Sequence, residues 1–235
     1  MEKELRYIDN SEIRFVGEGE SREVEGYALL FNTLSRPMRT KEGRRFVEQI
    51  VPEALDGVIG NSDVFATLNH DEKRGILGRS RFGTGTLTLS VDERGLKYTF
   101  SAPKTALGDE CLEYLRRGDI CQSSFAFTTD KDKWEPQVDG SYIRTITHFD
   151  RLFDVSPVFE PAYFGTEVSC RSLEEFIIEE ERKEAEAKAE QERLEQEKRE
   201  AEEAEKKAKL EAYYSQLREE YKDALQKAEE LNNNQ

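Results

Sequence analysis

Histidine is the side chain that most readily moves protons near neutral pH, and the 235-residue chain has only two, His70 and His148. Any chemistry that needs an imidazole must use one of them. His70 lies between Asn69 and Asp71, directly after the apolar segment DVFATL. A strand that ends there would present His70 at a surface cleft as a general base. The same three residues also suit an ordinary turn at the end of a strand.

Ser124 lies within the segment CQSSFAF (121–127) and is a candidate nucleophile. On a strand, successive side chains alternate between faces, so Phe125 and Phe127 share one face and Ser124 lies on the other. A serine in that position is either a small residue that allows tight packing or a nucleophile held on a rigid element. The G-x-S-x-G sequence is absent, which argues against an α/β-hydrolase.

Asp154 is a carboxylate with apolar neighbours in LFDVSPV (152–158). If it is drawn into the core, its charge needs a hydrogen-bonding partner, and an imidazole N–H would be suitable. The alternative is an aspartate on an edge strand that faces water.

The cysteines at 111, 121 and 170 are odd in number and lack C-x-x-C spacing, so they fit neither a disulfide framework nor a zinc site. Cys121 could act as a thiol nucleophile with His148. Its apolar neighbours instead predict a raised pKa and an inert, buried thiol.

The elements that must position these residues are mostly short strands. Their spacing, with few helices between them, predicts an α+β fold that is mainly β, a small Greek-key or partly open barrel rather than a parallel α/β sheet. Strands are predicted in 12–31 (two, around the turn GEGES), 63–68, 84–91 and 95–102 (a hairpin), 120–129, 141–149 and 151–158; helices are predicted at 52–59 and 107–117; a loop is predicted around Trp134 and Pro136.

Composition changes at Ser172. All glycines, prolines, cysteines and histidines and the single tryptophan precede it, whereas residues 173–235 are mostly Glu, Lys, Ala and Gln. That tail carries 21 acidic and 12 basic residues, more than half of the net charge of −15. We therefore expect a folded domain at 1–172 and a charged helical arm at 173–235.

Several protein classes are excluded. No stretch approaches the ~18 apolar residues of a membrane span, and the start MEKELRYIDN is not a signal peptide. The acidic balance and the lack of a basic block argue against nucleic-acid binding. We expect an intracellular, soluble protein without a metal or cofactor.

The tail has its own pattern. Ser172 to Glu175 reads as a capping box, with Ser172 as the N-cap residue. Six acid–base pairs at i,i+4 spacing support a long solvated helix: Glu179–Lys183, Glu184–Lys188, Glu195–Arg199, Glu202–Lys206, Glu203–Lys207 and Glu205–Lys209. A heptad pattern then runs through 210–231, with a and d positions at Leu210, Tyr214, Leu217, Tyr221, Ala224, Ala228 and Leu231. A short coiled coil and a monomeric or disordered charged helix both remain open.

Six segments, taken in order, resemble the prohead (procapsid maturation) protease family of tailed bacteriophages, serine endopeptidases allied to the herpesvirus assemblins. The segments are REVEGYALLFN, VEQIVPEAL, NHD followed by GILGR, TLTLSVDERGLKYTFSAP, RRGDICQSSFAF and LFDVSPVFEPAYFGTEVSCR. The resemblance implies an assemblin-like fold, a small antiparallel β-barrel ringed by helices. It also implies that Ser124 is the nucleophile, His70 the general base and Asp154 the third catalytic residue.

Two positions stay open within that resemblance. The family commonly has a glutamate where this chain has Asp154, and assemblins use a second histidine as the third member, which makes His148 a rival. We favour Asp154 because its surrounding motif matches. Arg144 and Arg171 are candidate donors to the oxyanion, although each is better explained as an ordinary surface charge.

The resemblance implies an endopeptidase that cleaves capsid or scaffold protein, and itself, inside the phage procapsid in the host cytoplasm. The tail would be an internal scaffold or targeting segment that pairs with scaffold helices or with a second copy of the chain, and also a site of self-processing. The alternative is a catalytically silent scaffolding protein that acts through its C-terminal coiled coil.

Overall fold

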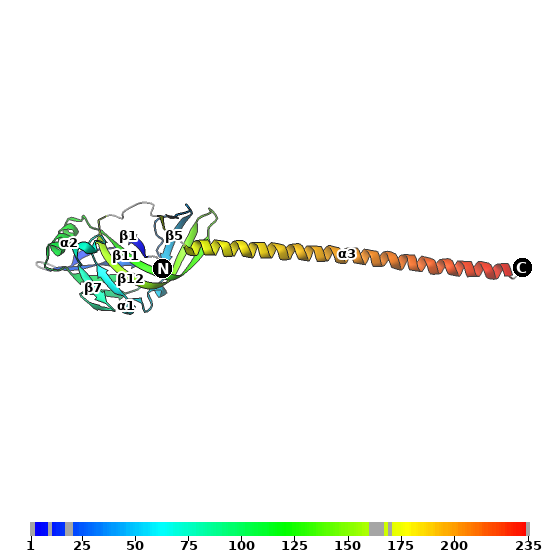
Figure 1. The fold of residues 1–235 in the computed structure, drawn as a ribbon, viewed down its shortest axis with the longest axis horizontal. Helices are drawn as coiled ribbons and strands as arrows, with labels where there is room; N and C mark the ends of the chain where they lie inside the picture. Colours follow the sequence, from blue (N-terminus) through cyan, green and yellow to red (C-terminus); the bar gives the residue numbers. More distant parts are fainter. Residues whose placement is uncertain (1–2, 9–10, 17–20, 160–166, 169–170, 234–235) are drawn as a thin grey trace. The chain divides into compact units, whose positions relative to one another are not determined.

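The computed structural model describes residues 3–8, 11–16, 21–159, 167–168 and 171–233. Its contacts divide the chain into two units, Met1–Leu173 and Glu174–Gln235. The first unit is mainly sheet with short helices, and the second consists of most of one long helix, α3 (Arg171–Asn233) (Figure 1). The predicted α+β class, mainly β with a long C-terminal helix, is confirmed.

The larger sheet is built around β12 (Tyr142–Val158). Along one edge, β12 pairs with the antiparallel β11 (Gln122–Pro136). Two parallel strands, β5 (Arg45–Ile50) and β6 (Asp63–Ala66), share the other edge at opposite ends. The first described strand, β1 (Glu4–Ile8), pairs antiparallel with β11. The sheet is completed by β4 (Met38–Thr40), β7 (Gly78–Arg81), β8 (Thr84–Gly85) and β13 (Glu167–Val168).

The smaller sheet has the strand order β2-β3-β10-β9. It contains the predicted hairpin, β9 (Leu87–Val91) with β10 (Gly95–Ser101), and the two strands predicted within 12–31. These two are β2 (Arg14–Val16) and β3 (Glu23–Leu30), which pair antiparallel. Residues 17–20, most of the turn predicted between them, lie outside the described residues.

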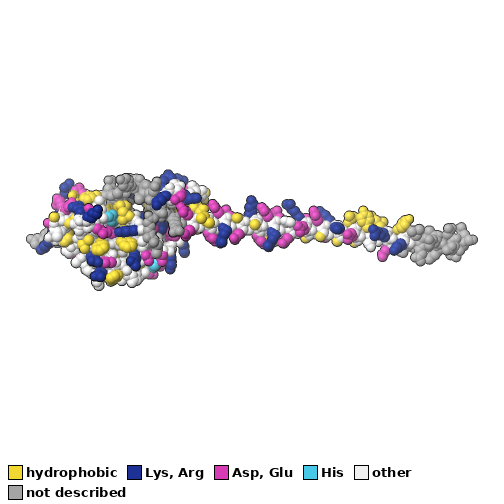
Figure 2. All heavy atoms as spheres, in the orientation of Figure 1, with side chains coloured by type: hydrophobic (Ala, Val, Ile, Leu, Met, Phe, Trp, Pro, Cys, Tyr) yellow, Lys and Arg dark blue, Asp and Glu magenta, His cyan; other side chains and the backbone are white. Residues whose placement is uncertain are grey.

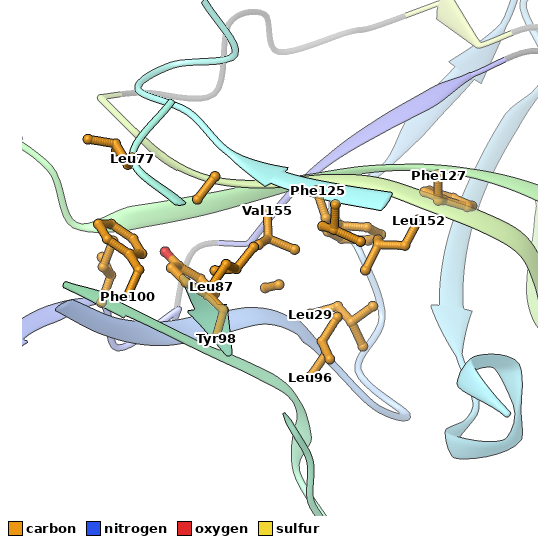
Figure 3. Packing of buried hydrophobic residues seen from close by; sticks show 14 of the residues in the cluster. Leu29, Leu77, Leu87, Leu96, Tyr98, Phe100, Phe125, Phe127, Leu152 and Val155 are labelled. Carbon is orange, nitrogen blue, oxygen red and sulfur yellow. The ribbon is translucent and has the colours of Figure 1, made fainter. Parts of the chain in front are cut away.

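The core lies between the two sheets. Figure 3 shows side chains of the smaller sheet facing those of β11 and β12; Leu29, Leu96, Tyr98, Phe125, Leu152 and Val155 are among them. All of these side chains are at most 3% exposed. The described strands form two packed sheets and no closed barrel, so the predicted barrel is not confirmed.

The helices follow local sequence signals, with one correction. The predicted helix at 107–117 is α2 (Ala106–Arg117), which begins after the N-cap Thr105 and ends at Gly118, whose φ of 77° suits glycine. The helix predicted at 52–59 is instead two short pieces, η1 (Pro52–Leu55) and α1 (Val58–Asn61). Gly57, with φ of 73°, separates them because a left-handed residue cannot continue a helix. One further 3₁₀ turn is η2 (Glu72–Arg74).

Two predictions on the long strands are wrong. The loop predicted around Trp134 and Pro136 is part of β11, and the two strands predicted at 141–149 and 151–158 are one strand, β12. Long-range pairing explains both, since Trp134 lies opposite Arg144 in a ladder that overrides local turn signals. The strands β1, β4, β5, β7 and β13 were not predicted, and the parallel pairings of β12 with β5 and β6 make this sheet mixed.

The start of α3 also corrects the sequence analysis. The helix begins at Arg171, and Ser172 lies inside it rather than at its N-cap. The Ser172 hydroxyl donates to Oδ2 of Asp132 (2.8 Å) and accepts from Nε1 of Trp134 (3.0 Å). Ser172 therefore ties the first turn of the helix to β11.

Acidic and basic side chains alternate along the surface of α3 (Figure 2). The predicted pairs Glu195–Arg199 (3.9 Å) and Glu205–Lys209 (2.6 Å) are formed, whereas Lys183 meets Glu180 (2.9 Å). Among the described helices, none is both long enough and apolar enough to cross a membrane.

Candidate active site

His70 lies in a tight turn directly after β6. Asn69 and His70 both have left-handed backbone conformations, with φ of 56° and 61°. Such conformations are uncommon for residues other than glycine and are concentrated at functional sites. The Asn69 N–H donates to the carbonyl of Pro157 in β12 (3.0 Å), and Asp71 caps η2 through Lys73 N–H (3.1 Å). The turn predicted from Asn-His-Asp is therefore present, and it holds His70 beside β12.

The imidazole of His70 approaches Asp154. Its Nδ1 lies 2.8 Å from Oδ1 of the carboxylate, although the angle departs from that of a good hydrogen bond. The side chain of Asp154 is 3% exposed and that of His70 is 20% exposed. Asp154 lies on β12 between Ala126 of β11 and Phe65 of β6, so the alternative of an edge-strand aspartate facing water is wrong.

The carboxylate of Asp154 is held by the hydroxyl of Thr67 and, through it, by the hydroxyl of Ser156. The Thr67 hydroxyl donates to Oδ2 of Asp154 (3.2 Å) and lies 2.9 Å from the Ser156 hydroxyl. Ser156 in turn accepts from the Thr67 backbone N–H (3.0 Å). Since all three side chains are buried, the network fixes Asp154 in position and compensates part of the desolvation of its charge. Neither Thr67 nor Ser156 was singled out from the sequence, although they lie within the segments DVFATL and LFDVSPV noticed there.

The two neighbouring serines of β11 lie on opposite faces, as the alternation predicts. The Ser123 hydroxyl is 2.7 Å from the Tyr98 hydroxyl, on the same face as Phe125 and within the core. Ser124 lies opposite Ser156 of β12, on the face that carries Asp154. Of the two serines, Ser124 is the one brought to the side of the sheet where the histidine lies.

In this state Ser124 and His70 are not hydrogen-bonded to each other. The Ser124 hydroxyl is fully buried and donates to the backbone carbonyl of Arg6 in β1 (2.7 Å). His70 Nε2 is buried and has no hydrogen-bond partner among the described residues. Tyr7, next to Arg6, places its ring edge-on to the imidazole with 6.1 Å between centroids, and burial raises the pKa of its hydroxyl. A serine–histidine bond would require the Ser124 hydroxyl to leave the Arg6 carbonyl.

His148 lies elsewhere on β12. Its Nδ1 is 2.5 Å from Oδ1 of Asp130, and both side chains are 35% exposed. His148 is eight residues before Ser156, the residue opposite Ser124, which corresponds to roughly 25 Å along a strand. The structure therefore brings Asp154, and not His148, to His70.

Cys121 does not have the environment predicted for it. It is exposed just before β11, whereas Cys111 is buried in α2, where burial raises the pKa of its thiol to about 12. The pairing of Cys121 with His148 is not formed, because the imidazole of His148 meets Asp130 near the other half of β12. Cys170 lies outside the described residues.

Arg144 is not a surface charge, and its guanidinium is bound by buried carboxylates. Its guanidinium is 4% exposed and bonds to both carboxylate oxygens of Glu4 (2.7 and 3.0 Å) and to Asp132 (2.7 Å). Burial lowers the pKa of Arg144, but the hydrogen bond to Glu4 and the nearby carboxylates outweigh it and raise the pKa. The side chain of Arg171 lies outside the described residues.

Within the described ranges, no three His, Cys, Asp or Glu side chains gather in a way that could hold a metal ion. The chemistry that the arrangement supports is proton transfer by an imidazole, oriented by a buried carboxylate, to or from a nearby hydroxyl.

Comparison with known proteins gives one family. Residues 9–178 match the family described as caudovirus prohead serine protease. No curated protein sequence matches the chain. Among solved structures, the bacteriophage T4 capsid assembly protease gp21 aligns with a TM-score of 0.38 and 13% identity, over 68% of this chain and 100% of that one. The family match covers most of the chain.

Proposed function

The chain belongs to the caudovirus prohead serine protease family and is a serine peptidase, and we propose that Ser124, His70 and Asp154 are its catalytic residues. The observation that carries this assignment is the approach of His70 Nδ1 to the buried Asp154 at 2.8 Å, with His70 Nε2 left unpartnered among the described atoms. An imidazole held in this way has one nitrogen oriented and the other ready to accept a proton.

In the proposed reaction, His70 Nε2 takes the proton of the Ser124 hydroxyl as Ser124 attacks a peptide carbonyl carbon. The C–N bond breaks, and His70 returns the proton to the leaving amine. Water then hydrolyses the acyl-enzyme with His70 again as base. Asp154 holds the imidazole tautomer and stabilises the imidazolium, and Thr67 holds Asp154. The shorter aspartate serves here because the His70 turn is fixed directly beside β12 through Asn69.

The proposed substrates are the capsid protein and its scaffolding segment, within the procapsid, and the chain itself. The support is the family to which residues 9–178 belong, since a prohead protease acts during capsid maturation. The same membership favours an enzyme over a catalytically silent scaffolding protein.

The proposed role of α3 is to pair with a helix of the scaffold or of a second copy. Its support is a run of exposed apolar side chains near the described end of the helix, visible as a hydrophobic group in Figure 2. Leu210, Tyr214, Leu217 and Tyr221 are 42–69% exposed and recur every four and three residues. The side chains of Ala224, Ala228 and Leu231, the rest of the predicted heptad pattern, lie outside the described residues. A chain truncated after residue 173 should be packaged poorly into procapsids, and full packaging would contradict this role.

Co-expression with the capsid protein tests the catalytic assignment. Ser124→Ala should abolish cleavage of the capsid protein and of the chain itself, as read from product masses, because it removes the attacking oxygen. Circular dichroism should show that the variant remains folded.

The matched control is Ser123→Ala, which removes the neighbouring hydroxyl on the opposite face of β11. It should destabilise the fold by about 1 kcal/mol through loss of the bond to Tyr98, while cleavage persists. Full cleavage by Ser124→Ala would overturn the assignment and make Ser123 the next residue to test.

A further inference from the structure

The edge of β11 that carries Ser124 is covered by β1. The register runs antiparallel from Glu4 opposite Phe127 to Ile8 opposite Ser123. On its other edge, β11 pairs with β12 along its whole length. Among the described strands, β1 is therefore the only one on this edge, and its removal would leave a row of unpaired backbone groups. Such an edge binds extended peptides by adding them as a further strand.

The backbone of β1 meets the proposed nucleophile where a substrate peptide bond would lie. The carbonyl oxygen of Arg6 accepts the Ser124 hydroxyl at 2.7 Å. Tyr7, the next residue, lies opposite Ser124 in the register and contacts the ring of His70. The peptide bond between Arg6 and Tyr7 is thus held at the serine, with the following residue beside the histidine.

In this arrangement β1 occupies the edge of β11 beside Ser124 but is not positioned to be cleaved. The hydroxyl proton that His70 would have to accept is donated instead to the Arg6 carbonyl oxygen. With Ser124 so engaged and His70 Nε2 unpartnered in the described part of the chain, the proton cannot pass between them. Release of β1 would free the hydroxyl for His70.

The side chain of Arg6 is held by a buried carboxylate. Its Nε and Nη2 both donate to Glu48 of β5, the latter at 2.9 Å, so the pair is bidentate. Arg6 is 7% exposed and Glu48 only 3%. The guanidinium also lies over the ring of Phe127, 5.7 Å from its centroid. A planar, bidentate carboxylate contact with an aromatic face is the chemistry that distinguishes arginine from lysine.

We propose that the outer edge of β11 is the substrate-binding edge of this peptidase and that β1 occupies it as a substrate would. Glu48 then selects an extended segment with arginine at the residue whose carbonyl meets Ser124. The strand β1 precedes residues 9–178 that match the family, in keeping with an occupant added to the peptidase fold. The inference rests on the catalytic role proposed for Ser124 and deepens it.

In the reaction that follows displacement of β1, Ser124 Oγ forms a bond to the carbonyl carbon of the substrate arginine, and the bond to the next nitrogen breaks. The hydroxyl proton passes through His70 to the leaving amine, and water releases the new carboxylate. Water is the only co-reactant of this step, and no change of oxidation state occurs.

The test uses the full chain and a fluorophosphonate, a probe that phosphonylates activated serines without needing a known substrate. Arg6→Glu places a like charge against Glu48 and should release β1, so that Ser124 is labelled at least 10-fold faster than in the wild type, as measured by intact mass. The matched control is Arg14→Glu on β2, the same charge reversal at an exposed arginine that pairs with Glu25 at 2.5 Å. It should label at the wild-type rate.

The outcomes distinguish a failure of the proposed occupancy by β1 from a failure of the catalytic role proposed for Ser124. Equal labelling of wild type and Arg6→Glu would overturn the inference and leave Ser124 as the nucleophile. Absence of labelling in every folded variant would overturn both. If Arg6→Glu does not fold, the full chain with Arg6→Gln weakens the contact with Glu48 without introducing a like charge and is judged by the same rates.

Arginine selection is measured with a peptide of residues 3–8, KELRYI, added to the full-length variant in which the contact of Arg6 with Glu48 is lost. The peptide should protect Ser124 from labelling or be cleaved after its arginine. A peptide with glutamine in place of the arginine should be at least 10-fold weaker, because it cannot form the charged bidentate contact with Glu48. Equal protection by the two peptides would overturn the role of Glu48.

Discussion

The strand β12 takes part in two histidine–aspartate pairs that look alike in composition and differ in place. Near one end, Asp154 meets His70 at 2.8 Å; in the other half, His148 meets Asp130 at 2.5 Å. The Asp154 side chain is 3% exposed, whereas both members of the second pair are 35% exposed. A polar contact contributes little when water competes for both partners and more when both are buried and hydrogen-bonded. Burial, and not the presence of a pair, separates the proposed catalytic site from a surface contact.

Replacing the two histidines should give the largest difference in activity between the two pairs. His70→Ala should lower cleavage of the capsid protein at least 1,000-fold, because it removes the proposed general base. His148→Ala, its matched control, should stay within about twofold of the wild type, since weak surface pairs contribute little. Rates of product formation in co-expressing cells measure both, and the reverse order would restore His148 as the rival for the site.

The aspartates give the next largest difference. Asp154→Asn should lower kcat by about 100-fold or more, because the amide neither stabilises an imidazolium nor fixes the tautomer. Asp130→Asn should leave kcat unchanged. Steady-state cleavage of a capsid-derived peptide distinguishes them, and a loss confined to KM in Asp154→Asn would argue against its orienting role.

Replacing Thr67 tests how much the buried hydrogen bond to Asp154 contributes to the stability and activity of the His70–Asp154 pair. Thr67→Val keeps the shape of the side chain but removes the hydroxyl between Asp154 and Ser156. We expect destabilisation by about 1–3 kcal/mol, because buried partners lose a hydrogen bond, and a fall in kcat of about 10-fold as Asp154 becomes less constrained. Urea unfolding and cleavage rates measure the two effects. A stability loss without any change in kcat would limit Thr67 to a structural role.

The smallest expected effect is the loss, at low pH, of the stability that the Asp130–His148 pair contributes. Hydrogen bonding to His148 lowers the pKa of Asp130 below its ordinary value of 3.8. A lowered folded-state pKa contributes stability above the unfolded value, and this contribution disappears as pH falls through the folded value. His148→Ala should therefore destabilise by no more than about 0.5 kcal/mol at pH 5, and this difference should vanish near pH 2. Thermal unfolding at the two pH values measures it, and a difference that grew in acid would contradict the sign.

Much of the local structure could be predicted because its signals are local. The hairpin of β9 and β10, the helix α2 with its end at Gly118, and the long charged helix follow from alternation, glycine positions and composition. The alternation in 121–127 likewise predicted the faces of Ser124 and Phe125.

The errors concern residues whose partners are distant in sequence. Trp134 was predicted in a loop with Pro136, yet pairing with Arg144 extends β11 through it. Ser172 was predicted as an N-cap, yet Asp132 and Trp134 bind its hydroxyl. The sequence around Cys121 suggested a buried thiol, but burial depends on what packs against it in the fold, and Cys121 is exposed.

By itself, the sequence determined the division into a glycine-containing head and a charged helical tail, the two histidines available for proton transfer, and the family to which the head belongs. It also determined, by the period of a strand, that adjacent serines must face opposite ways. Tertiary structure decided which aspartate meets His70, and it placed β1 over Ser124 with Arg6 against Glu48. The physical reason is the distance along the chain between the partners. Arg6 and Glu48 are 42 positions apart, and Arg6 and Ser124 are 118 positions apart. At such separations strand pairing and burial, and not local conformational preference, determine which residues meet.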